Sequence, residues 1–150
     1  MKGLTQRRGG AEEINTITGK IIQCAIEIHR VLGPGLLESV YETIWERKLS
    51  QCGFVVERQI AVPIFFEGMK FDEGFRADII VNRLVCIELK SVENLAPVHS
   101  KQLLTYLKLL GMEVGLLINF GAPVLKESLH RIVNNYHEPN TSSPRLRASA

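Results

Sequence analysis

The sequence has 150 residues, of which 45% are hydrophobic and 23% are charged, a balance typical of a soluble globular protein with one domain. The formal net charge of +2 permits a nucleic-acid partner but does not argue for one, because strongly basic nucleic-acid-binding domains have a pI above about 9. No apolar run approaches the roughly 18 residues of a membrane-spanning helix, so we expect no membrane partner.

The chain is expected to begin with two helices after a flexible leader at residues 1–11. From Glu12 to Leu32, apolar residues recur at helical spacing, and Gly33-Pro34-Gly35 ends this helix. A second helix is predicted from about Leu36 to Gln51, ending near Gly53.

A strand-rich block follows the two helices. Residues 54–68 (FVVERQIAVPIFFEG) predict either one strand or two strands that meet near Pro63. Glu67-Gly68 predicts a turn into a further strand at residues 69–81.

The remaining elements complete a sheet with helices packed on it. They are, in chain order, a reversal at Asn82-Arg83, a strand at residues 84–90, a helix from Pro97 to Leu110 ended by Gly111, a buried strand at residues 113–120, an edge strand or short helix at residues 129–136, and a disordered tail at residues 137–150. Hairpins followed by a helical crossover indicate the α/β (α+β) class, with a mixed β-sheet flanked by helices in one domain at residues 12–136.

Two neighbouring strands carry charges where buried strands normally have none. Around Asp78, Glu88 and Lys90, apolar residues occupy both odd-numbered and even-numbered positions, which point to opposite faces of a strand. This pattern indicates strands that are covered on both faces. Burial of such ions costs several kcal/mol each unless they are paired or bind a cation. Glu88 and Lys90, two residues apart, project from the same face of their strand. A solvated face of an antiparallel hairpin is the alternative.

The length of the connecting loop decides whether these charges meet. A two-residue turn at Asn82-Arg83 would put the side chains of Asp78 and Glu88 on different faces of the sheet. A three-residue loop would instead pair Val81 with Val85, so that Asp78 and Glu88 are cross-strand neighbours on the same face. The site hypothesis therefore predicts an odd loop or a bulge at this reversal.

Two opposed carboxylates, from Asp78 and Glu88, suit Mg²⁺ or Mn²⁺, which prefer hard oxygen ligands. Such an ion lowers the pKa of water and stabilises charge on a reacting phosphate. Lys90 beside it could orient the attacking water or offset the phosphate charge. A purely structural ion cluster is the alternative, because ion-pair networks also produce such groupings.

Asp78 together with Glu88-Leu89-Lys90 resembles the D…(D/E)-x-K signature of the PD-(D/E)xK nuclease superfamily. The segment GLLESVY at residues 35–41 is similar to the signature of the GxxExxY protein family, a branch of that superfamily. Further agreement in HRVLGPGLLE, FRAD, IELK, HSKQLLTYLK and GLLINFG extends the resemblance over about residues 12–133. One departure is Ala77, where the signature has Pro. The resemblance implies a restriction-endonuclease-like core in αβββαβ order and metal-dependent cleavage of phosphodiester bonds.

The resemblance also implies roles for individual residues. Asp78 and Glu88 match the metal-binding acids, and Lys90 matches the catalytic lysine. The backbone carbonyl of Leu89 matches a further metal contact, and Glu38 resembles the first-helix glutamate that many members place near the metal.

Five further residues are predicted to support the site or to bind substrate: Gln102, Tyr106, Tyr41, Arg76 and His99. Gln102 and Tyr106 resemble the Q-x-x-x-Y pattern of exonuclease-like branches, and His99 shares their helix face. Tyr41 shares a helix face with Glu38, and Arg76 could bind phosphate or pair with Glu88. A polar helix surface and a packed tyrosine are the simpler alternatives.

These patterns support an enzyme, a Mg²⁺-dependent (or Mn²⁺-dependent) nuclease. DNA is the favoured substrate, RNA is the second option, and a homodimer is a further option. One alternative is a non-catalytic module on a nuclease fold that binds nucleic acid or protein, and another is different metal-dependent phosphoester chemistry. The three cysteines show no paired zinc spacing, so we expect a reduced, cytoplasmic location.

Overall fold

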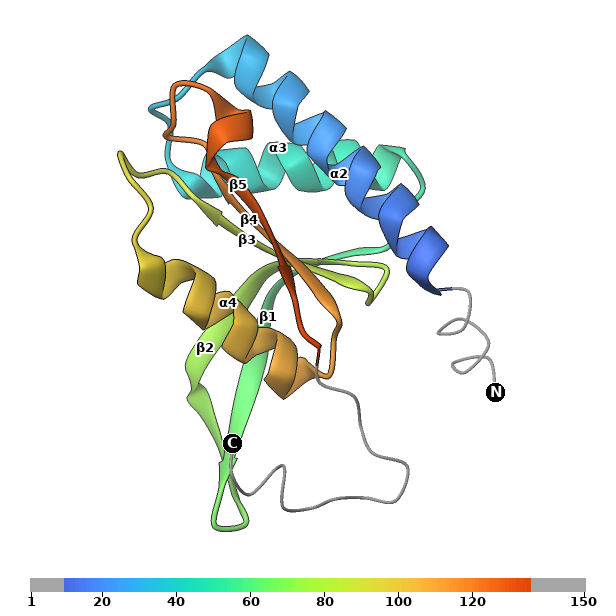
Figure 1. The fold of residues 1–150 in the computed structure, drawn as a ribbon, viewed down its shortest axis with the longest axis vertical. Helices are drawn as coiled ribbons and strands as arrows, with labels where there is room; N and C mark the ends of the chain where they lie inside the picture. The colour runs from blue at the N-terminus through green and yellow to red at the C-terminus, as the bar shows by residue number, and fades with distance from the viewer. Residues whose placement is uncertain (1–9, 136–150) are drawn as a thin grey trace.

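The computed structural model describes residues 10–135 and is shown in Figure 1. The expected disordered tail at residues 137–150 lies outside the described residues, as does the expected leader except for Gly10 and Ala11, which belong to the first helix. The domain limits of residues 12 and 136 therefore stay a prediction.

Within the described residues, three α-helices form where the sequence analysis predicts helices: α2 (Gly10–Leu32), α3 (Glu38–Gln51) and α4 (Pro97–Leu110). Helix α2 buries one apolar stripe, whereas α4 has proline in its first turn and ends at Gly111, whose φ of 71° suits glycine. Among the described residues, no helix combines the length and the apolarity needed to cross a membrane.

The sheet has five strands in the order β1-β2-β3-β4-β5. They are β1 (Val56–Phe66), β2 (Met69–Val81), β3 (Val85–Lys90), β4 (Val114–Asn119) and β5 (Leu129–Val133). Strands β3 and β4 are parallel and joined through α4, whereas every other neighbouring pair is antiparallel. The predicted α+β fold class with a mixed, helix-flanked sheet is confirmed.

The structure also resolves the two open alternatives in the strand assignment. Residues 56–66 form one strand that continues through Pro63, and residues 129–133 form an edge strand rather than a helix. A short 3₁₀ helix, η1 (Leu125–Ser128), precedes β5 and was not predicted, because four residues are too few to show a periodic pattern.

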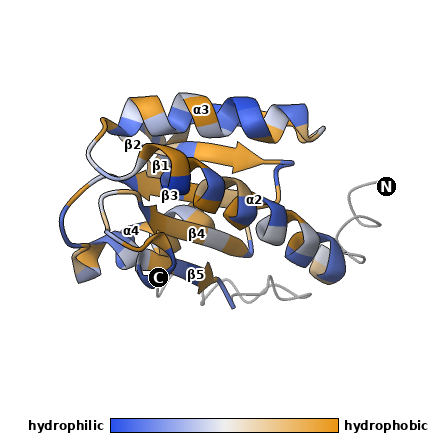
Figure 2. Cartoon of the chain, turned by 90° about the horizontal axis from the view of Figure 1, so that it is seen from above, coloured by the Kyte–Doolittle hydropathy of each residue, from blue (hydrophilic) through white to orange (hydrophobic). Residues whose placement is uncertain are grey.

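Helices cover both faces of the sheet, and Figure 2 shows α3 and α4 on opposite sides of the strands. One core cluster joins α2 and α3 to odd-numbered positions of β3, such as Ile87 and Leu89. A second cluster joins α4 to the other face at Cys86 and Leu117. Strand β3 is consequently buried at every residue before Lys90, which explains its apolar sequence.

The β1–β2 hairpin is much longer than its contact with the rest of the sheet. Residues of β2 pair with β3 only from Ile79 to Val81, and the hairpin continues past α4 to a tip that projects away from the body of the molecule (Figure 1). Asp78 stands at the position where β2 leaves β3. The fold therefore places the predicted acids where two paired strands separate.

Candidate metal centre

The loop between β2 and β3 has the odd length that the site hypothesis requires. Val81 pairs with Val85, and Ile79 pairs with Ile87, so three residues form the loop. Asn82 fixes this loop to the start of β1, because its Oδ1 accepts the N–H of Val55 at 2.8 Å. This register directs Asp78 and Glu88 to the same part of the sheet, as predicted.

The pairing of β2 with β3 ends at Ile79, next to Asp78. From there the Asp78 side chain, and not the backbone of β2, accepts a hydrogen bond from β3. The backbone N–H of Leu89 donates to Asp78 Oδ2 at 2.9 Å, in place of a bond to the backbone of β2. The carboxylate of Asp78 is therefore fixed directly against β3, beside Glu88.

Glu88 is 5% exposed, and its two carboxylate oxygens have different surroundings. Oε2 lies 3.7 Å from Lys90 Nζ, whereas Oε1 is buried and has no hydrogen-bond partner among the described residues. A buried carboxylate oxygen without a donor is unfavourable by roughly 1–3 kcal/mol or more, since the lost hydration is not replaced. The arrangement therefore leaves one oxygen free to accept a donor or a cation.

The electrostatics of both acids reflect this burial. Removal from water, together with the charge of the neighbouring Asp78, raises the pKa of Glu88 to about 8, although Lys90 opposes the shift. Burial likewise raises the pKa of Asp78 to about 6, although the hydrogen bond from Leu89 opposes the shift. A divalent cation would offset the repulsion between the two carboxylates and return them to the charged form.

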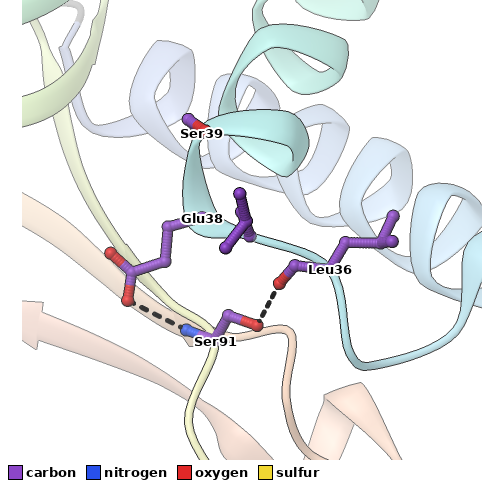
Figure 3. Close-up of a pocket in the computed structure, with 5 residues that line it drawn as sticks. Leu36, Glu38, Ser39 and Ser91 are labelled. Carbon is purple, nitrogen blue, oxygen red and sulfur yellow. Dashed lines mark hydrogen bonds between the residues drawn. The ribbon is translucent and has the colours of Figure 1, made fainter.

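Glu38 reaches the same region from the first turn of α3. Its Oε2 accepts the backbone N–H of Ser91 at 3.2 Å, and Ser91 Oγ donates to Leu36 O at 2.7 Å (Figure 3). The Glu38 charge is among the causes of the raised pKa values of Asp78 and Glu88. Glu38 is therefore within electrostatic range of both acids, while hydrogen-bonded to the chain beyond β3.

A pocket of about 400 Å³ opens next to this position. It is lined by Leu36, Leu37, Glu38, Ser39 and Ser91 (Figure 3). Because Ser91 directly follows Lys90, the pocket adjoins the C-terminal end of β3, where the predicted charges gather.

Tyr106 approaches the acids from α4. It is buried and packs against Phe75, with ring centroids 5.3 Å apart. Burial raises its pKa to about 12, and the charges of Glu88 and Asp78 contribute to the shift. Gln102, one turn earlier on α4, is half-buried and forms no hydrogen bond with another described residue. Both residues remain candidates for contact with substrate.

Three other predicted residues have structural partners instead. Tyr41 is fully buried, stacks on Phe120 at 4.4 Å, and its hydroxyl donates to the Gly33 carbonyl. His99 Nδ1 accepts the N–H of Ala96 and so caps α4. Arg76 donates to the Gln59 carbonyl at 2.9 Å, and among the described ion pairs none joins it to Glu88.

Sequence reasoning missed Glu42, Arg58 and Gln59. Glu42 is 5% exposed and accepts hydrogen bonds from both other residues. Its place one helical turn after Glu38 was a usable signal, because residues four apart share a helix face. Nothing in the sequence indicated that β1 would bring Arg58 and Gln59 to it.

The donor set fits a hard divalent ion with few protein ligands. Within the described part of the chain, no group of three or more His, Cys, Asp or Glu side chains is arranged to hold a metal. Asp78, Glu88 and the Leu89 carbonyl, completed by water, would suit Mg²⁺ or Mn²⁺, since Mg²⁺ sites usually retain several waters. The unpartnered Oε1 of Glu88 is the observation that fits such an ion.

Comparison with known proteins agrees with this reading of the residues. The sequence model of the PD-(D/E)XK nuclease superfamily matches residues 15–132, which include Asp78, Glu88 and Lys90. No curated protein and no solved structure matches the chain. Since the match covers most of its length, the chain belongs to the PD-(D/E)XK nuclease superfamily.

Proposed function

We propose that this protein is a metal-dependent nuclease that hydrolyses phosphodiester bonds, with DNA as its substrate in preference to RNA. Superfamily membership supports a hydrolase that acts on nucleic acid. We also assign the chain to the GxxExxY branch, on the strength of Gly35, Glu38 and Tyr41 at the spacing of that signature.

The buried, unpartnered Oε1 of Glu88 beside Asp78 carries the proposal. A purely structural cluster would be expected to satisfy every buried charged oxygen from within the protein, because an orphaned one destabilises the fold. In a site for an exchangeable cation, by contrast, that oxygen is free because it is a ligand of the ion.

The proposed roles follow from position. Asp78, Glu88 and the Leu89 carbonyl hold Mg²⁺ or Mn²⁺, and the ion supplies charge stabilisation and a water of lowered pKa. Lys90, 3.7 Å from Glu88, is placed to orient the attacking water or to offset charge on the phosphate. Glu38 adds a negative charge at the edge of this centre and forms a wall of the adjoining pocket. That pocket, which adjoins the end of β3 at Ser91, is the proposed place for a substrate strand.

Cleavage assays with purified protein test the proposal. Labelled single-stranded DNA, duplex DNA, branched DNA and RNA are incubated with and without Mn²⁺, and Lys90→Ala serves as the mechanistic variant. We expect Mn²⁺-dependent cleavage of DNA that Lys90→Ala abolishes or strongly reduces. Binding of nucleic acid and Mn²⁺ without cleavage of any substrate would instead support the non-catalytic binding module.

Two further expectations belong with this proposal. Cys24, Cys52 and Cys86 are free thiols in the structure, which is consistent with a reduced, cytoplasmic location. A homodimer stays a prediction, and light scattering across a range of protein concentrations would test it.

A further inference from the structure

Glu42 is a buried carboxylate whose charge is fully engaged by strand β1. Its Oε2 accepts from Arg58 Nε at 2.9 Å, and its two oxygens lie 3.0 and 3.2 Å from Gln59 Nε2. Arg58 in turn donates to Thr43 Oγ1, which fixes the guanidinium on the surface of α3. The carboxylate thus anchors two consecutive residues of β1 on the helix that begins at Glu38.

Gln59 adopts an unusual backbone conformation at this anchor. Its φ is 52°, in the left-handed region that residues other than glycine adopt at a cost. Arg58 pairs with Ile79 and Ile60 pairs with Ala77, so the described pairing passes over Gln59 and the residue opposite it, Asp78. The strand is therefore irregular at the single position that faces the predicted metal ligand.

The Gln59 amide joins Glu42 to Asp78. An amide nitrogen has two hydrogens to donate, and Gln59 Nε2 lies near Glu42 on one side and 3.4 Å from Asp78 Oδ1 on the other. Asp78 Oδ2 is held separately by the Leu89 N–H. Each oxygen of Asp78 therefore has one protein donor, and each keeps a lone pair for a metal ion.

We infer that Gln59, held by Glu42, is a positioning residue that fixes the Asp78 carboxylate for metal binding. This inference rests on the function proposed above and deepens it. Outer hydrogen-bond partners of metal ligands orient the ligating atoms, and their removal typically weakens metal binding about 10–100-fold. Loss of the amide leaves Asp78 Oδ1 without its protein donor, so the carboxylate can rotate about its side-chain bonds.

Two substitutions at Gln59 separate the amide from the strained backbone. Gln59→Gly removes the amide and relieves the strain, whereas Gln59→Met removes the amide and keeps an unbranched side chain at the same φ. Glu67→Gly is the matched control, because Glu67 has the same φ of 52° at the exposed tip of the hairpin. Mn²⁺ affinity is measured by titration calorimetry, and the melting temperature of each metal-free variant is measured alongside.

We expect Gln59→Gly and Gln59→Met to weaken Mn²⁺ binding by a similar factor, on the order of 10–100-fold. We expect Glu67→Gly to bind like the wild type, and Gln59→Gly to melt within a few degrees of it. If the wild type binds Mn²⁺ and both Gln59 variants bind it with the same affinity, this inference is overturned and the proposed function is not. Failure of the wild-type protein to bind Mn²⁺ would overturn the proposed function, and the inference with it.

Discussion

Glu42 and Glu88 are buried to the same extent, at 5% exposure each, but the protein satisfies only one of them. Glu42 accepts hydrogen bonds from Arg58 and Gln59 through both of its oxygens. Glu88 has a lysine 3.7 Å from one oxygen, and the described part of the chain supplies no partner for the other. Burial of a carboxylate therefore does not by itself mark a site. A buried oxygen that lacks a hydrogen-bond donor is the more informative signal.

The largest effect on cleavage is expected at Lys90, the only cation among the described residues that pairs with Glu88. Lys90→Ala should lower Mn²⁺-dependent cleavage by roughly 10²–10³-fold, the loss typical when one group that stabilises the transition state is removed. Mn²⁺ affinity should change much less, because Lys90 is not a ligand. Lys48→Ala, which removes a surface partner of Glu27, is the control and should cleave normally. Unchanged cleavage by Lys90→Ala would refute the assigned mechanism even if the protein is active.

The stability of the metal-free protein should depend on pH through Glu88. Its pKa in the folded protein is about 8, above its ordinary value of 4.5, so the folded state binds the proton more tightly than the unfolded chain does. The resulting stability is complete below about pH 4.5 and is lost as the pH rises through about 8. Asp78 adds a shift of the same sign, with its pKa raised to about 6.

Urea unfolding at pH 5 and pH 8 in the presence of a chelator measures this dependence. We expect the free energy of unfolding to be lower at pH 8, by on the order of a few kcal/mol, since each unit of pKa shift corresponds to about 1.4 kcal/mol. Saturating Mn²⁺ should remove most of the difference. Equal or greater stability at pH 8 without metal would contradict the burial of an uncompensated Glu88.

Substitution of each buried glutamate by glutamine should change stability in opposite directions at pH 8 without metal. Glu88→Gln removes an unfavourable buried charge and should raise the free energy of unfolding. Glu42→Gln removes the partner of Arg58 and should lower it, by about 1–3 kcal/mol. Chemical unfolding of the two variants beside the wild type measures both changes. If they shift stability in the same direction, the two glutamates do not differ in the way described.

The smallest effect is expected at Tyr41, which the GxxExxY signature singled out. Tyr41→Phe removes a hydroxyl that bonds Gly33 and Leu36 but keeps the ring stacked on Phe120. We expect a loss of about 1 kcal/mol in stability and no change in Mn²⁺ affinity. A weakened Mn²⁺ affinity in this variant would instead place Tyr41 in the metal centre.

Local patterns in the sequence were sufficient for most of the fold. Helical periodicity located α2, and the apolar runs at β3 and β4 predicted strands buried on both faces. The requirement that Asp78 and Glu88 share a face predicted an odd loop or a bulge after Val81, because side chains alternate along a strand, and the structure has a three-residue loop there.

The contacts that support the predicted metal ligands could not be predicted from the sequence, because they depend on tertiary structure. Gln59 is 17 residues from Glu42 and 19 from Asp78 along the chain. Its left-handed backbone could not be predicted, because glycine is the residue type that indicates this conformation and position 59 is a glutamine. The orphaned oxygen of Glu88 is likewise visible only after every neighbouring donor has been placed. Sequence reasoning thus singled out Asp78, Glu88 and Lys90, but it did not predict that Arg58 and Gln59 neutralise Glu42 while one oxygen of Glu88 stays without a donor.

Binding of Mn²⁺ to Asp78 and Glu88, measured by titration calorimetry at pH 7.5, tests the central claim most directly. The wild-type protein should bind the ion, Asp78→Asn and Glu88→Gln should each abolish binding, and Asp72→Asn on the exposed hairpin should bind like the wild type. Absence of binding by the wild type, or equal binding by Glu88→Gln, would contradict the account.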